Sequence, residues 1–448
     1  MCGILIEFEH PKLVGKYLKK IKHRGTTSKT LQHNHIGFGH ARLAIQGLDK
    51  KYDQPWVNDK EIILFNGEIF NYKELNPQFK SDILLLEEGF DVSTFDGFFA
   101  IVKYEKFSEK IKVWTDKLGQ KQLFYRLSDG KITGICSEIK GLVRAKDKPD
   151  YHYLAQVYKF GYSLSDRTAV ENIKRFLPGK EYTITRQQIV SVKNLIFDSK
   201  KLCDEKKLYD MIDFSVRRRL VSDVPVSFLF SGGIDSSIIL HHLLKYQRDI
   251  KVFTIKNNVD YEYAKKLSEL WGFELNYLDI KQPDYDKIHT ANESAVDLGS
   301  VIPNYLLFEA IAKQKYKVVL SGDVADELFG GYKRMKEFDC QLSDINDELT
   351  HYHFPRLDKL SMAHTVELRC PYAALYLLDF ALSLPYKERI GKKFLKDAYR
   401  GIIPDFIIDR EKMPLKIDAI RDNKEEERHK LVKAWEEKLF KRLKNGKY

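Results

Sequence analysis

Cysteine is scarce in this sequence, and its placement excludes two common kinds of framework. The chain of 448 residues has five cysteines, which are scattered and never form a Cys-x-x-Cys pair. This spacing excludes the usual zinc sites, and a disulfide scaffold would need a denser set. We therefore expect free thiols and a cytoplasmic location. The cysteines are Cys2, Cys136, Cys203, Cys340 and Cys370.

Long apolar runs, repeats and low-complexity segments are also missing. No stretch approaches the ~20 apolar residues that cross a bilayer, and the first residues lack the pattern of a secretory signal. The net charge of +11 comes from lysines spread along the chain, without a nucleic-acid-binding motif. We expect no membrane and no nucleic-acid partner, and at most a general attraction for anionic substrates.

The residues that are present suffice for two domains. Hydrophobic residues make up 43% of the chain and charged residues 31%, a composition typical of a soluble globular protein. A chain of this length exceeds one ordinary hydrophobic core. Short strands dominate the first part and alternating strands and helices the second, which predicts domains at 1–199 and 200–448.

The clearest local pattern is a strand, a glycine turn and a helix start. The apolar run 226–230 predicts a buried parallel strand. Gly232 and Gly233 let the backbone turn sharply and approach a ligand. The free N–H groups at the start of a helix, with the positive end of its dipole, favour an anion such as phosphate. An ordinary turn between a strand and a helix is the alternative interpretation.

The polar residues of this turn indicate which kind of anion it could bind. Hydroxyls can donate to phosphate oxygens, whereas the ionised carboxylate of Asp235 only accepts hydrogen bonds. An aspartate next to a phosphate is understandable when a divalent cation lies between them. The Gly-Lys-Ser/Thr ending of a Walker loop is absent. The string 231–237, S-G-G-I-D-S-S, instead resembles the pyrophosphate loop of ATP pyrophosphatases, which cleave ATP between the α and β phosphates. The hydroxyls belong to Ser231, Ser236 and Ser237.

Beyond this loop, strand and helix patterns alternate. Such alternation predicts a parallel sheet covered on both faces, with ligands at the carboxyl ends of its strands. The expected strands are 251–255, 274–278 and 317–320, and the expected helices are 261–271 and 304–316.

A second polar cluster follows the predicted strand 317–320. Asp323, Asp326 and Glu327 lie within five residues and would repel one another unless a cation lay among them. Asp235 follows a neighbouring strand in such a sheet. Asp235 and Asp326 could therefore share a Mg²⁺ ion bound to pyrophosphate. A solvated acidic turn is the alternative.

The chain begins Met1-Cys2-Gly3, which places a thiol at the N-terminus if Met1 is removed. The α-amine of such a cysteine has a reference pKa of about 8 and can accept the thiol proton. Many short strands follow, which predicts two stacked antiparallel sheets with helices. A buried cysteine that merely starts a strand is the alternative.

Separated strings in the first half occur in the order found in the glutaminase domain of class II glutamine amidotransferases, which are N-terminal-nucleophile hydrolases. They include His40-Ala41-Arg42-Leu43, the string from Asn66 and the pair Ser81-Asp82. The resemblance implies that Cys2 is the nucleophile, that Arg42 binds the glutamine α-carboxylate and that Asp82 binds its α-ammonium. A structural salt bridge and a plain hairpin are the alternatives. The implied oxyanion donors and the glutamine-orienting residue are Asn66, Gly67 and Glu68.

The strings 231–237 and 321–332 together resemble the synthetase domain of glutamine-hydrolysing asparagine synthetases, and 357–363 and 366–372 extend the match. The resemblance implies that Asp323 is a catalytic carboxylate that acts on the incoming nitrogen. It further implies that Lys412 contacts phosphate in the transition state, and that Glu293 lies near the acceptor. The implied ATP- and pyrophosphate-binding residues are Ser231, Gly232, Gly233, Asp235, Ser236, Ser237, Ser321 and Gly322.

The chain also departs from these family patterns. Thr26-Thr27 and Gln122 replace residues, prolines among them, that shape loops in the family. Asp323 stands where many asparagine synthetases have the longer glutamate, and Val324 replaces a usual glycine. The last two changes put the backbone shape and the specificity of the synthetase site in question.

The segment 425–448 is rich in lysine and glutamate. Apolar residues recur in it at helical spacing, which predicts an amphipathic terminal helix that packs on its own domain. These residues are Leu431, Trp435, Leu439 and Leu443.

The two halves complement each other, because a glutaminase supplies ammonia and an ATP pyrophosphatase activates a carboxylate. We predict ATP- and Mg²⁺-dependent, glutamine-hydrolysing amidation of a carboxylate through an acyl-AMP. The simplest case is aspartate to asparagine, with release of AMP, pyrophosphate and glutamate. A dry channel between the sites is expected, since protonated ammonia is no nucleophile. Amidation of a sugar or secondary-metabolite carboxylate and a non-catalytic regulatory role are alternatives. The acceptor and the oligomeric state, a homodimer included, stay open.

Overall fold

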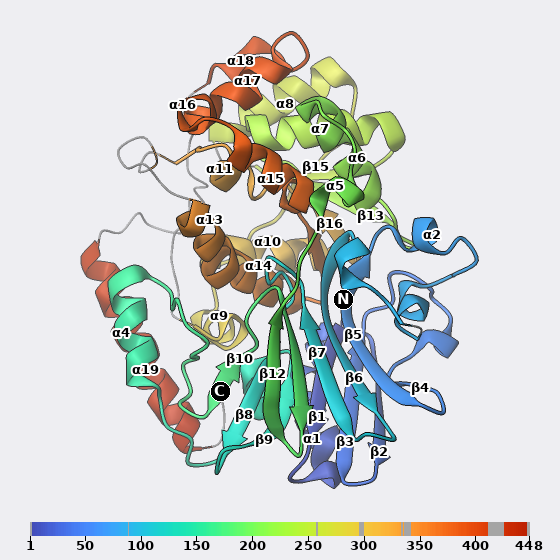
Figure 1. Cartoon of the computed structure of the whole chain (residues 1–448). Helices are drawn as coiled ribbons and strands as arrows, with labels where there is room; N and C mark the ends of the chain where they lie inside the picture. The colour runs from blue at the N-terminus through green and yellow to red at the C-terminus, as the bar shows by residue number, and fades with distance from the viewer. Residues whose placement is uncertain are drawn as a thin grey trace.

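The computed structural model describes residues 2–87, 89–256, 259–294, 300–332, 335, 342–410 and 425–445. Two antiparallel sheets form most of the first half, and a parallel sheet with helices forms the second (Figure 1). The predicted fold class, an α+β N-terminal-nucleophile sandwich followed by an α/β doubly wound domain, is confirmed. The exact boundary between 199 and 200 stays a prediction.

The first sheet has six strands, and Cys2 begins one of its inner strands. This strand is buried along its whole length because its side chains alternate between two apolar layers. Ile4 and Ile6 join the core between the two sheets, whereas Leu5 packs in a cluster with outer helices. The order is β10 (Ile173–Arg175), β8 (Phe124–Ser128), β9 (Lys131–Cys136), β1 (Cys2–Glu7), β3 (Ile36–Arg42) and β2 (Thr27–His33).

The second sheet also has six strands and lies against the first. Ile62 and Leu64 face the first sheet, whereas Ile63 and Phe65 join an apolar cluster on the outer face. This alternation holds the strand that carries Asn66 between two cores. The order is β12 (Gln188–Asn194), β11 (Lys180–Thr185), β7 (Lys110–Thr115), β6 (Gly97–Glu105), β5 (Glu61–Ile69) and β4 (Trp56–Val57).

Short helices cover the outer faces of this sandwich. The helix expected from Asp82 is present as a 3₁₀ turn. The helices are η1 (Pro11–Leu13), α1 (Val14–Leu18), η2 (Lys19–Arg24), η3 (Lys50–Tyr52), α2 (Tyr72–Leu75), η4 (Asp82–Leu86), η5 (Val92–Thr94), α3 (Ile139–Leu142) and α4 (Tyr151–Phe160).

The third sheet has five strands, all parallel where they pair. Its first four strands along the chain match the predicted segments closely. The fifth strand, β17, was not predicted, because it is only three residues long and two of them are charged. The order is β15 (Leu275–Leu278), β14 (Lys251–Ile255), β13 (Val226–Leu229), β16 (Val318–Leu320) and β17 (Glu367–Arg369).

Helices cover both faces of this parallel sheet (Figure 1). The helices at 234–246, 259–271 and 301–313 confirm the predicted alternation. The helices are α5 (Ser199–Leu202), α6 (Leu208–Arg219), α7 (Ile234–Tyr246), α8 (Val259–Trp271), α9 (Tyr285–Asn292), α10 (Val301–Lys313), α11 (Ala325–Leu328), α13 (Leu342–Glu348), η6 (Leu349–His353), α14 (Phe354–Met362), η7 (Pro371–Ala373), α15 (Leu375–Ser383), α16 (Tyr386–Arg389), η8 (Ile390–Lys392), α17 (Lys393–Tyr399) and α18 (Asp405–Ile408).

The terminal helix α19 (Glu425–Lys444) does not pack on its own half of the chain, so that expectation was wrong. Figure 1 shows it, in red, beside α4. The Tyr158 hydroxyl of α4 donates to Glu436 at 2.9 Å. Lys438 and Arg442 also contact Asp286 of the second half, at 2.7 Å and, through the Asp286 carbonyl, at 3.3 Å. The apolar stripe of this helix packs in one cluster with residues of the first half. Its buried residues are Val432, Trp435, Leu439 and Leu443.

Among the residues that the structure describes, no helix is long and apolar enough to cross a membrane.

Candidate functional site

The proposed nucleophile lies where three strands of the two sheets come together. Cys2 pairs with Arg42 across β1 and β3, and the Cys2 nitrogen donates to Asn66 Oδ1 of β5 at 2.9 Å. This nitrogen becomes the α-amine if Met1 is removed. Burial raises the pKa of the Cys2 thiol, although the chain's amino terminus and Arg42 oppose the rise. A thiol with a raised pKa needs a base to become a nucleophile.

Asn66 and Gly67, the predicted oxyanion donors, lie next to each other on β5. Within the described part of the chain, the buried Asn66 Nδ2 has no hydrogen-bond partner. A buried donor without a partner is costly unless a ligand satisfies it. Gly67 admits no side chain, because a Cβ there would lie 2.0 Å from the Phe98 carbonyl oxygen. Glycine at this position therefore lets β5 lie close against β6.

The predicted glutamine-binding residues are buried around Cys2. Arg42 donates to the Gly47 carbonyl and, at 2.7 Å, to Asp53. Asp82 accepts a hydrogen bond from the Ile69 nitrogen at 3.0 Å, and burial raises the pKa of Asp82 to about 6. Arg42 and Asp82 thus place one cation and one carboxylate near Cys2, the two charges that bind a zwitterionic amino acid.

Glu68 faces the second half of the chain, and sequence reasoning missed its partner. Burial and the neighbouring Glu367 raise the pKa of Glu68 well above its ordinary value. Arg369 reaches Glu68 at 3.7 Å and Glu367 at 2.6 Å. The segment 366–372 was recognised only as part of a family pattern. The clue in the sequence was the alternation of two charged residues, Glu367 and Arg369, with an apolar one in a buried segment.

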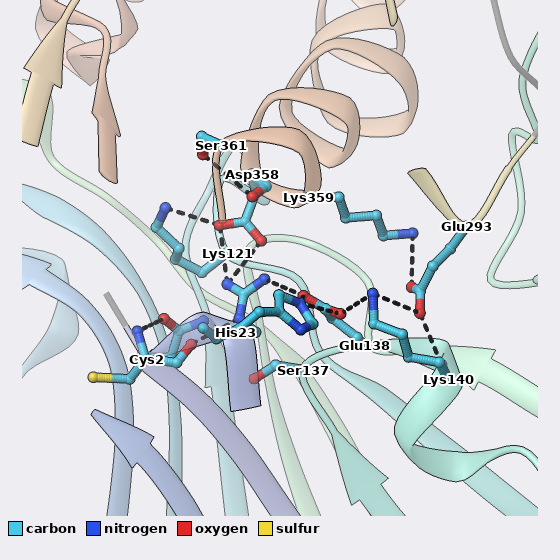
Figure 2. Close-up of polar contacts among 12 residues, drawn as sticks. Cys2, His23, Lys121, Ser137, Glu138, Lys140, Glu293, Asp358, Lys359 and Ser361 are labelled. Atoms are coloured by element: carbon cyan, nitrogen blue, oxygen red, sulfur yellow. Dashed lines mark hydrogen bonds and ion pairs between the residues drawn. The ribbon is translucent and has the colours of Figure 1, made fainter. Parts of the chain in front are cut away.

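The fully buried Arg24 connects Cys2 with the second half. Its guanidinium donates to the Cys2 carbonyl at 2.8 Å, to Glu138 at 2.8 Å and to Asp358 at 3.0 Å. Lys121 adds an ion pair with Asp358 at 3.1 Å. Figure 2 shows how Lys121 and Asp358 meet above Cys2. The two halves therefore join through buried charged groups directly beside Cys2.

Glu293 lies in the same contact. It is fully buried, its backbone is left-handed at φ +54°, and its carboxylate accepts hydrogen bonds from the nitrogens of Ile139 (3.0 Å) and Lys140 (2.8 Å). Lys359 lies 3.3 Å away. Figure 2 shows Lys140 between Glu138 and Glu293. Glu293 thus caps the short helix α3 of the first half, and its predicted contact with an acceptor stays a prediction.

The two sequence patterns of the second half meet at the ends of β13 and β16. A Cβ on Gly322 would lie 2.8 Å from the Ser236 nitrogen, so the two loops touch. Gly232 has φ +76°, and a Cβ there would lie 2.6 Å from the Asp260 carbonyl oxygen. Ser237 Oγ is buried at the start of α7 and has no hydrogen-bond partner among the described residues. Glycines and an available hydroxyl at a helix start suit a phosphate.

Arg410 supports this loop from the far end of the chain. It donates to the Gly232 carbonyl at 2.9 Å and forms an ion pair with Asp260. Asp260 lies in the first turn of α8. The loop is therefore tied to two elements that follow it in sequence. Lys412, two residues further on, lies outside the described residues.

Asp235 and Asp326 also converge, as the sequence predicts. Both contact one cation, the ammonium of Lys392, at 2.5 Å and 2.6 Å. In the described ranges, no group of three or more His, Cys, Asp or Glu could hold a metal. Two carboxylates at one cation position do fit Mg²⁺ that completes its shell with phosphate oxygens and water.

The turn that begins at Ser321 contains Asp323 and Val324, the two residues that depart from the family pattern of the synthetase site. The Ser321 hydroxyl donates to Asp323 at 2.5 Å. Val324 has φ +81° and so adopts the left-handed conformation that glycine adopts easily. Such a conformation costs a β-branched residue about 1–3 kcal/mol. The glycine-like backbone is therefore retained without the glycine.

These features define a class of protein before any comparison. A possible N-terminal nucleophile beside a vacant oxyanion donor is typical of a glutaminase, and its partner domain carries a phosphate-type loop with two converging carboxylates. The combination indicates a glutamine-dependent amidotransferase that activates its acceptor with a nucleotide.

Comparison with known proteins gives the family. A model of the asparagine synthase family matches residues 207–348 and 339–446, and a glutamine amidotransferase domain model matches 1–194. The chain belongs to the asparagine synthase family, whose members carry out glutamine-hydrolysing amidation with ATP.

Curated relatives extend over most of the chain. A probable glutamine-hydrolysing asparagine synthetase of Acanthamoeba polyphaga mimivirus is 26% identical, with 100% of this chain and 91% of the relative covered. A putative one of Methanocaldococcus jannaschii is 30% identical over 74% of this chain and 76% of the relative. Asparagine synthetase 1 of Bacillus subtilis is 29% identical over 92% and 86%.

Proposed function

We propose that the chain converts aspartate to asparagine with ATP and glutamine, through an aspartyl-AMP intermediate. The observation that carries this proposal is the contact between the loops at Ser236 and Gly322, which brings Asp235 and Asp326 to one cation position. Family membership supports the choice of aspartate.

In the first half-reaction, the Cys2 amine takes the thiol proton and the thiolate attacks the glutamine amide carbon. Arg42 binds the substrate carboxylate and Asp82 its ammonium, while Glu68 orients the side chain. Asn66 Nδ2 and the Gly67 N–H stabilise the oxyanion as it develops. The Cys2 ammonium returns this proton to the amide nitrogen, which leaves as ammonia, and water then hydrolyses the thioester to glutamate and the free thiol.

In the second half-reaction, the aspartate side-chain carboxylate attacks the α-phosphorus of ATP and pyrophosphate leaves. The ATP phosphates are bound by Gly232, Gly233 and the neighbouring hydroxyls. Asp235 and Asp326 would hold Mg²⁺, which neutralises phosphate charge. Ammonia then attacks the acyl carbon, Asp323 takes its proton, and AMP leaves. The hydroxyls are those of Ser231, Ser236, Ser237 and Ser321, and Lys412 completes the phosphate contacts.

The test is pyrophosphate release from ATP in the presence of glutamine, with and without aspartate. We expect release that depends on aspartate and matches asparagine formation mole for mole. An Asp235→Asn variant is the matched control, and it should lose pyrophosphate release but keep glutaminase activity. Glutaminase activity without aspartate-dependent pyrophosphate would contradict aspartate as the acceptor.

A different carboxylate is the second candidate. The short Asp323 and the strained Val324 change the side chains beside Ser321, where the proposed chemistry occurs. A panel of sugar acids and amino acids in the same pyrophosphate assay distinguishes the two candidates. The preferred acceptor is the one with the highest kcat/KM.

A further inference from the structure

Lys392 is a buried cation that the proposed mechanism leaves without a role. Only 5% of the residue is exposed. Its ammonium contacts Asp235 Oδ2 at 2.5 Å and Asp326 Oδ1 at 2.6 Å. Because these are the carboxylates proposed to hold Mg²⁺, the ammonium lies where the metal would lie.

The surrounding backbone is shaped around this lysine. Lys392 has φ +62°, a left-handed conformation that costs a non-glycine residue about 1–3 kcal/mol. Its nitrogen donates to the Phe329 carbonyl at 2.8 Å, next to the glycine pair 330–331. A Cβ on Gly331 would lie 1.9 Å from Asp326 Oδ1 and 2.5 Å from Lys392 Cε. Gly331 therefore leaves the room that the lysine and the carboxylate share.

The charge balance shows why a cation is needed there. The Lys392 ammonium forms ion pairs with both Asp235 and Asp326. Without it, two carboxylates would face each other in a partly buried site, which is unfavourable. An ammonium and a metal ion cannot occupy the same position between the same two oxygens.

We propose that Lys392 is an internal counter-cation that holds the metal position in the nucleotide-free protein and yields it when Mg²⁺ arrives with ATP. Its flexible four-carbon stem lets the ammonium move onto a phosphate oxygen. The free protein then binds divalent metal weakly, and metal and nucleotide bind together. The proposal rests on the proposed function only for the assignment of Asp235 and Asp326 to the metal.

The test is a Mn²⁺ titration of the nucleotide-free protein, followed through the electron paramagnetic resonance signal of free Mn²⁺. We expect weak binding by the wild-type protein and binding that is tighter by about tenfold or more in Lys392→Met, where the competing charge is gone. Lys392→Arg keeps a cation and should bind as weakly as wild type. In Lys392→Met combined with Asp326→Asn, the gain should disappear.

Several outcomes would overturn the proposal. One is a wild-type affinity for Mn²⁺ equal to that of Lys392→Met, and another is a gain that survives Asp326→Asn. If Lys392→Met fails to fold, the wild type alone decides. In the wild type, a non-hydrolysable ATP analogue should increase the affinity for Mn²⁺ by about tenfold or more. This increase is measured beyond the Mn²⁺ that the analogue binds by itself. Equal affinities with and without the analogue would contradict exchange.

The two proposals can fail separately, because the metal titration requires no amidation. A Lys392→Met variant that gains Mn²⁺ binding while the wild type releases no pyrophosphate with any acid would retain the lysine exchange and end the proposed function. The reverse result is also possible. If the wild type makes asparagine but binds Mn²⁺ as tightly as Lys392→Met, the proposed function is retained and the lysine exchange is contradicted.

Discussion

The two halves of this chain position their reactive groups by different means. In the glutaminase half, Cys2 and Arg42 lie opposite each other on paired strands, and the Asn66 side chain accepts a hydrogen bond from the Cys2 nitrogen. In the synthetase half, Asp235 and Asp326 lie on loops after strands and are held by Lys392. The first arrangement is ready for its substrate. In the second, the two carboxylates are neutralised by a lysine of the protein itself, which by our proposal yields its position to the metal.

The contact between the two halves uses both a backbone group and charged side chains. Arg24 binds the Cys2 backbone and two carboxylates, one from each half. Removing one partner of such a buried network costs several kcal/mol because the other charge is left unpaired. A change in either half of this network therefore reaches the backbone of Cys2.

The largest expected effect separates the halves completely. Cys2→Ala removes the nucleophile and should lower glutamine-dependent amide synthesis about 10³-fold or more. Synthesis from added ammonia should continue, because the synthetase half is untouched. Cys136→Ala, another buried cysteine, is the control and should retain glutamine-dependent synthesis. Equal loss with ammonia would mean that Cys2 acts in both halves.

Substitution of one glycine in either half should lower the activity of that half alone. Gly322→Ala forces a Cβ to within 2.8 Å of the Ser236 nitrogen, and Gly67→Ala forces one to within 2.0 Å of the Phe98 carbonyl oxygen. We expect the first to lower aspartate-dependent pyrophosphate release, and the second to lower glutaminase activity, each by about 10²-fold. Gly15→Ala has no atom within 4 Å of its new Cβ and is the control. Loss of both activities in either variant would contradict the separation.

A smaller effect tests the buried carboxylate of the glutamine pocket. Asp82 has a pKa of about 6 in the folded chain. It is uncharged below that pH and then holds an ammonium poorly. In Cys2→Ala, which binds glutamine without turnover, the Kd for glutamine should rise about tenfold per pH unit below 6. Calorimetry between pH 5 and 7 measures this, and Asp82→Asn should flatten the profile. A flat profile in the presence of Asp82 would contradict its role.

The raised pKa of Asp82 has the opposite consequence for stability. Its ionised form is less favourable in the folded chain than in the unfolded one, so its contribution is fully present below the unfolded-state pKa. The contribution is lost as pH rises from the ordinary range of a carboxyl through about 6.

The smallest effect concerns strain in the synthetase half. Val324 has φ +81°, so Val324→Gly should be more stable than Val324→Ala, by about 1 kcal/mol. At Val301, which begins the helix α10, the order should be reversed because alanine favours a helix. Urea unfolding of the four variants gives both comparisons. Alanine more stable than glycine at both positions would mean that Val324 is not strained.

Much of each site could be predicted from residues that are close in sequence. The strands 226–229, 251–255 and 318–320 and the helix at 234 follow from local apolar periodicity, which depends on a few neighbouring residues. The proposed nucleophile, the proposed pyrophosphate loop and the acidic turn were recognisable for the same reason, since each is a short string.

The tertiary structure alone decided which strings meet across long separations. Glu68 forms an ion pair with Arg369, and Glu293 accepts a hydrogen bond from the start of α3. The terminal helix packs on the first half. Lys392 reaches Asp235 across 157 residues. No periodicity records such contacts, because burial and charge pairing depend on which surfaces remain uncovered after the sheets form. The sequence by itself thus determined the chemistry available in each half, and the packing of one half on the other decided how buried charges are shared.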